Sequence, residues 1–83
     1  MSLIAKITGV EINEHNLEVI KFEIRETSDP NQKPFVSKLD IEEACFLAEG
    51  NMTNPNSAYG QLIRAFANHT YLDGLINREF QSL

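Results

Sequence analysis

Alternating hydrophobic and polar residues predict a β-strand between residues 17 and 27. Ile20, Phe22 and Ile24 fall on one side of an extended chain, and the charged residues between them fall on the other. This pattern is typical of an antiparallel strand with one buried face and one face in water. Residues 35–39 repeat the pattern over a shorter length, so we expect a third strand there with Phe35 and Leu39 facing inward.

The first predicted strand, residues 3–12, has an alternation that changes phase part-way. Ala5 and Ile7 fall on one face, whereas Ile4, Val10 and Ile12 fall on the other. A β-bulge at Gly9 would bring the two halves into one phase, because one extra residue reverses the alternation of the side chains. The alternative is a strand that is buried on both faces, one of them by a partner. The polar turn that follows predicts a hairpin with the second strand.

Two helices are predicted after the strands. Asp40 fits an N-cap with Glu43 at the capping-box position, and Gly50 fits the helix end. Asn56 or Ser57 would cap the second helix. The hydrophobic residues recur at helical spacing in both segments (Ile41, Ala44, Cys45 and Ala48; then Tyr59, Leu62, Ile63 and Phe66).

A further set of hydrophobic residues follows at helical spacing: Tyr71, Leu72, Leu75, Ile76 and Phe80. On one straight helix this set would point away from the face that carries Phe66, since successive residues turn by about 100°. Either the chain breaks near residues 68–70 and a third helix begins, or one helix continues and its end faces something else. Thr70 followed by Asp73 fits a new cap and favours the break.

These elements predict an α+β fold in which a three-stranded antiparallel sheet (β-β-β) is followed by two or three helices packed on one face. We expect one domain over residues 1–83, because a chain of this length supports one small core. The expected core consists of Ile7, Ile20, Phe22, Ile24, Phe35, Leu39, Ile41, Cys45, Leu62, Ile63 and Phe66.

Charge argues against two classes of partner. The net charge is −5, and the 7 Lys and Arg residues are scattered along the chain. Nucleic-acid binding requires clustered cations, and an acidic protein is not attracted to an anionic membrane surface. No stretch is long and apolar enough for a membrane span, and the N-terminal residues do not resemble a signal peptide. The cytoplasm is therefore the expected compartment.

Few residues suggest chemistry. Cys45 lies on the apolar stripe of the first helix and is expected to pack in the core. His69 lies at the end of the second helix, where a protonated ring would favourably meet the negative end of the helix dipole. His15 falls in a turn, and the two histidines alone do not make a metal site. We expect no catalytic residues, cofactor or metal, and hence no enzyme.

The leading functional hypothesis is a non-enzymatic module that acts by protein–protein contact, as a homodimer or an accessory subunit. Its candidate interface is the C-terminal set Tyr71, Leu72, Leu75, Ile76 and Phe80 or, alternatively, the first strand. An acidic inhibitor that imitates nucleic-acid charge is one alternative. A small nucleic-acid-binding regulator is another, and it would use the exposed face of the second strand around Lys21 and Arg25.

Overall fold

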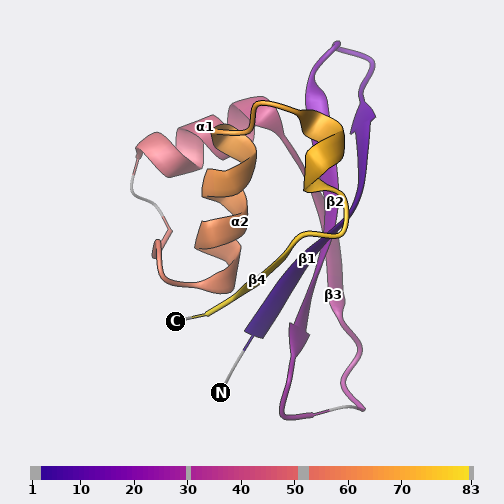
Figure 1. Cartoon of the computed structure of the whole chain (residues 1–83), viewed down its shortest axis with the longest axis vertical. Helices are drawn as coiled ribbons and strands as arrows, with labels where there is room; N and C mark the ends of the chain where they lie inside the picture. Colours follow the sequence, from indigo (N-terminus) through magenta and orange to yellow (C-terminus); the bar gives the residue numbers. More distant parts are fainter. Residues whose placement is uncertain (1–2, 30, 51–52, 83) are drawn as a thin grey trace.

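The computed structural model describes residues 3–29, 31–50 and 53–82. It is an α+β fold with an antiparallel sheet, as expected, but the sheet has four strands in the order β3-β2-β1-β4. The two α-helices lie together on one side of the sheet (Figure 1). The elements are β1 (Leu3–Ile12), β2 (Glu18–Glu26), β3 (Phe35–Asp40), α1 (Ile41–Glu49), α2 (Ala58–Ala67), the short 3₁₀ helix η1 (Leu72–Leu75) and β4 (Glu79–Gln81).

The expected hairpin and the bulge at Gly9 are both confirmed. Ile7 lies opposite Phe22, and the register then shifts so that Gly9 lies opposite Lys21 and Val10 opposite Ile20. Directly opposed residues share a face of the sheet. The shift therefore places Val10 and Ile12 on the same face as Ile7, whereas Ile4, before the bulge, lies on the outer face opposite Arg25.

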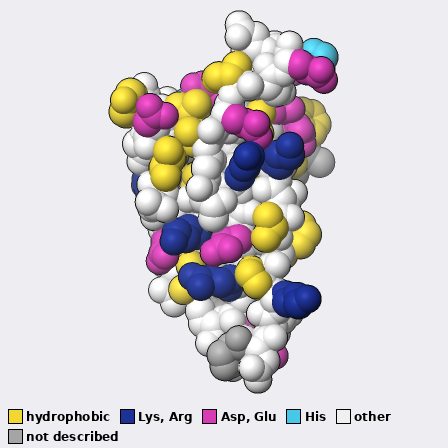
Figure 2. All heavy atoms as spheres, turned by 90° about the vertical axis from the view of Figure 1, so that its right-hand side faces the viewer, with side chains coloured by type: hydrophobic (Ala, Val, Ile, Leu, Met, Phe, Trp, Pro, Cys, Tyr) yellow, Lys and Arg dark blue, Asp and Glu magenta, His cyan; other side chains and the backbone are white. Residues whose placement is uncertain are grey.

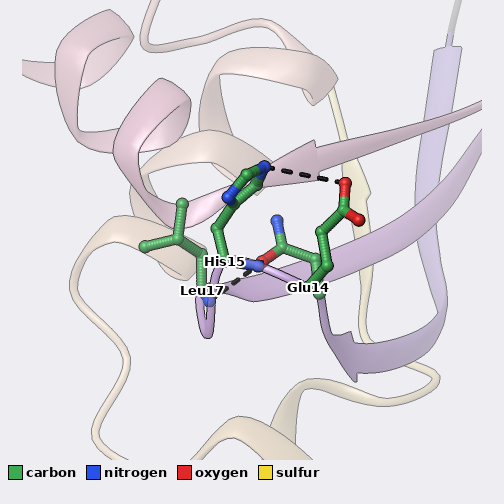
Figure 3. Close-up of polar contacts among 4 residues, drawn as sticks. Glu14, His15 and Leu17 are labelled. Carbon is green, nitrogen blue, oxygen red and sulfur yellow. Dashed lines mark hydrogen bonds and ion pairs between the residues drawn. The ribbon is translucent and has the colours of Figure 1, made fainter.

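The turn between β1 and β2 is organised by the Asn13 side chain. Its Oδ1 accepts hydrogen bonds from the backbone N–H groups of His15, at 2.9 Å, and Leu17, at 3.0 Å. Figure 3 shows the His15 ring directed to the Glu14 carboxylate, with Nε2 3.6 Å from Oε1. Asn16 adopts a φ of 64°, a left-handed conformation that Asn tolerates better than most residues. The turn is thus held by local hydrogen bonds.

Side-chain caps start both helices as the sequence predicts. The Glu43 N–H donates to Asp40 Oδ1 at 2.8 Å, and the Gly60 N–H donates to Ser57 Oγ at 2.9 Å. Gly60 is required for close approach within this helix start, because a Cβ there would lie 2.0 Å from the Asn54 carbonyl oxygen. The loop before α2 therefore packs directly on the backbone of the first helical turn.

The predicted third helix is wrong. The chain breaks after α2 as favoured, but Thr70 does not cap a new helix; Tyr71 precedes the four-residue η1, without a side-chain cap. Asn77 then turns the chain with a φ of 69°, and its N–H donates to the Ile7 carbonyl at 2.8 Å. The following residues pair with β1, with Phe80 opposite Ala5. The conformation of residues 77–81 is therefore set by hydrogen bonds to the backbone of β1, which is far away in the sequence.

Most of the expected core is buried between the sheet and the helices. The core consists of Ala5, Ile7, Ile20, Phe22, Leu39, Ala44, Ala58, Leu62, Ile63, Phe66, Leu75 and Phe80. Ile24 and Ile41 pack against it and are partly buried, and Cys45 is also only partly buried. Phe35 is the clear exception, because 62% of its surface is exposed. The prediction that Phe35 belongs to the core is therefore wrong.

Candidate interaction surface

The exposed position of Phe35 follows from the shape of the sheet. Phe35 lies opposite Ile24, on the face that the helices cover. However, the end of the sheet near the β2–β3 connection extends beyond the helices (Figure 1). Phe35 therefore lies on the same face of the sheet as the core, as its alternation with Leu39 predicts. No helix covers it there.

Strand β3 also forms an edge of the sheet. Among the residues that the structure describes, it pairs with β2 and with no other strand. Val36, next to Phe35, points to the opposite face and is 67% exposed. The strand thus offers unpaired backbone groups together with two large apolar side chains. Such an edge is a template for another strand.

Charges are distributed unevenly along this edge. Lys33 lies just before the strand and is exposed. At the other end Asp40 leads into α1, whose first turn carries Glu42 and Glu43, both exposed. The edge is therefore positive at its beginning and negative at its end. Lys38 lies between these ends, on the outer face.

The outer face of the sheet is not covered by the helices and carries charges of both signs (Figure 2). Lys21 and Lys38 each place Nζ 3.9 Å from Oε1 of Glu11, and Arg25 lies 3.7 Å from Glu23. These ion pairs are at least partly exposed, so each contributes little to stability. They do, however, balance the positive charge of this face.

A shallow hollow of about 300 Å³ lies across β1, β2 and β3 beside the start of α1, and it is lined in part by Glu11, Asp40 and Glu43. A hydrogen bond with the Asp40 side chain, followed by burial and the Asp40 charge, raises the pKa of Glu43. Burial and the nearby Glu43 charge raise the pKa of Tyr59. Within the described ranges no group of three or more His, Cys, Asp or Glu residues is placed to hold a metal ion.

The two histidines and Cys45 do not form a site together. His15 is in the exposed turn, whereas His69 follows α2 and has 10% of its side chain exposed. The Phe66 carbonyl oxygen lies within hydrogen-bond distance of His69 Nδ1, and Nε2 lies 3.1 Å from the Glu18 carboxylate. His69 thus connects the end of α2 to the beginning of β2, and this is a structural role.

The predicted C-terminal interface is not one continuous surface. Leu75 and Phe80 are buried in the core, and Leu72 packs against it. Tyr71 and Ile76 are exposed, by 68% and 40%. The first strand, the other candidate, lies between β2 and β4 and is not an edge. Sequence reasoning missed the β3 edge because it assigned Phe35 to the core; the proline and polar residues before Phe35 were a signal that the strand lies at an edge.

Comparison with protein-family models, with curated proteins and with solved structures finds no match to this chain. No helix among the described residues is long and apolar enough to cross a membrane.

Proposed function

We propose that this protein is a non-enzymatic protein–protein interaction module that binds its partner along strand β3. The observation that carries the proposal is the combination of an unpaired sheet edge with two exposed apolar side chains, Phe35 on one face of the sheet and Val36 on the other. A partner strand added to this edge would pair the free backbone groups and cover both side chains.

Phe46 offers a matched control for this proposal. It lies on α1 and is 64% exposed, against 62% for Phe35, so the two residues are the same in type and nearly the same in exposure. They differ in place, because Phe46 is on helix α1 and Phe35 is on the edge strand β3. A comparison of the two separates binding at the edge from general adhesion of an exposed aromatic ring.

The test uses a photoreactive phenylalanine analogue at position 35 or at position 46, in the cells that produce the protein. We expect a discrete cross-linked product from position 35 and none from position 46. Equal products from both positions, or none from position 35, would show that β3 is not the binding surface. The mass of the product gives the mass of the partner.

Nucleic-acid binding is the second candidate, and one observation favours it. Lys6, Lys21, Arg25 and Lys38 all fall on the outer face of the sheet. We rank it lower because Glu11 and Glu23 lie among these cations and pair with three of them. Fluorescence anisotropy with a labelled oligonucleotide decides: binding in the micromolar range that weakens steeply with added salt would favour this function over the first.

A further inference from the structure

We propose that the partner at β3 is a second copy of this chain, with the two β3 strands antiparallel around a two-fold axis at Ser37. This inference rests on the proposed function and names its partner. The pairing would join two four-stranded sheets into one. Two-fold dimers are the commonest assemblies of soluble proteins, and in them one surface patch must complement itself. The β3 edge meets this requirement in its charge, its shape and its register.

Charge is the first argument. In an antiparallel pair, the beginning of one strand lies beside the end of the other. Lys33 of one copy therefore comes next to the acidic first turn of α1 in the other copy, and the same contact forms a second time by symmetry. An edge that is positive at one end and negative at the other is complementary to itself in this orientation. A parallel arrangement would instead put like charges together.

The second argument is that the helices cover only part of one face of the sheet. With Ser37 on the axis, Phe35 of one copy lies opposite Leu39 of the other, on the face that carries the core. Leu39 is 4% exposed and lies where the chain enters α1, whereas Phe35 is at the end that the helices do not reach. The bare end of each copy thus meets the covered end of the other, and the row of core residues continues across the axis.

The register follows from the outer face. An axis at Lys38 would place two like charges opposite each other, which destabilises a sheet. An axis at Ser37 places Lys38 opposite Val36, so that the apolar stem of the lysine can lie over the exposed valine. This register pairs the stretch from Phe35 to Leu39 on both copies, which leaves only Asp40 of the six-residue strand outside it.

Sedimentation equilibrium at tens of micromolar measures the association. We expect a mass of twice 9.4 kDa for the wild type, a dissociation constant weakened at least tenfold by Val36→Glu, and no change with Tyr71→Glu, because Tyr71 is 68% exposed and precedes η1, which packs on β1 and not on β3. Far-UV circular dichroism of both variants verifies that they fold. A wild-type protein that stays at 9.4 kDa at several hundred micromolar would overturn the proposal.

A charge exchange tests the orientation. Lys33→Glu and Glu42→Lys should each weaken self-association by about tenfold, because each variant repels itself twice across the axis. An equimolar mixture should recover the wild-type affinity, since the opposite charges then meet at both contacts. Recovery in the mixture supports the two-fold antiparallel pairing, and two variants that associate as well alone as together would exclude it.

Cysteine cross-linking tests the register. In a Cys45→Ala background, Ser37→Cys should form an intermolecular disulfide under mild oxidation, because only residue 37 lies opposite itself. Val36→Cys, the neighbouring control, should cross-link much less. A dimer that cross-links at 36 and not at 37 would contradict the register. If the wild type is monomeric while the photoreactive residue at 35 captures a different protein, this inference fails and the proposed function stands.

Discussion

The two edges of the sheet differ in length, in composition and in how the chain protects them. Strand β4 is three residues long, its central Phe80 is buried, and its neighbours Glu79 and Gln81 are exposed and polar. Strand β3 is six residues long and exposes Phe35 and Val36. Short, polar edges resist further pairing, whereas long apolar edges invite it. The comparison therefore points to β3 as the edge at which another strand can bind.

The edge at β4 is further secured by a contact from the helix side. The Gln61 side chain on α2 donates a hydrogen bond from Nε2 to the Gln81 carbonyl oxygen at 2.7 Å. Phe80 adds its ring to the core, and the Arg78 guanidinium lies over that ring, 5.2 Å from its centre. Phe80 therefore serves the fold, while Phe35 contributes little to it. This contrast can be measured.

The largest expected effect separates the two phenylalanines. Phe80→Ala should lower the free energy of unfolding by about 3 kcal/mol, because it removes a buried ring and leaves a cavity. Phe35→Ala should change it by less than about 0.5 kcal/mol, since the ring is mostly in water. Urea denaturation of both variants in a Val36→Glu background, which weakens self-association, measures the two losses. Similar losses from the two variants would contradict the comparison.

A smaller effect is expected from the hydrogen bond that holds β4. Gln61→Met keeps the length of the side chain and removes the donor, which should cost about 1 kcal/mol. Amide hydrogen exchange should become faster in β4 and remain unchanged in β3. If exchange accelerated equally at both edges, the contact would support the whole sheet and not this edge.

The smallest effect concerns pH at the acidic end of β3. The contact with Asp40 raises the pKa of Glu43, so the Glu43 carboxylate binds a proton more tightly in the folded protein than in the unfolded chain. The stabilisation by this proton is fully present below 4.5, the ordinary pKa of a glutamate, and is lost as pH rises through the higher pKa of the folded state. Glu43→Gln should therefore be slightly more stable than wild type at pH 7, and this gain should disappear at pH 4. Thermal unfolding at both pH values measures the difference.

Local pattern determined the three long strands, the bulge and both helix starts. The phase change around Gly9 located the bulge because a strand with one buried face keeps all its apolar side chains on that face. Asp40 and Ser57 marked the helix starts because a capping side chain satisfies backbone N–H groups in the next turn of the chain. These features depend on residues that are close together in the sequence.

Only the tertiary structure decided β4 and the exposure of Phe35. The spacing between Tyr71 and Phe80 is helical, yet β1 offers unpaired backbone groups there, and residues 79–81 complete its hydrogen bonding. Leu39 and Phe35 show the same alternation, but α1 begins directly after Leu39, and the helices do not extend over Phe35. Alternation fixes the side of the sheet to which a residue points. How far the helices reach along that side is set by packing between distant segments, and it leaves Phe35 at an open edge.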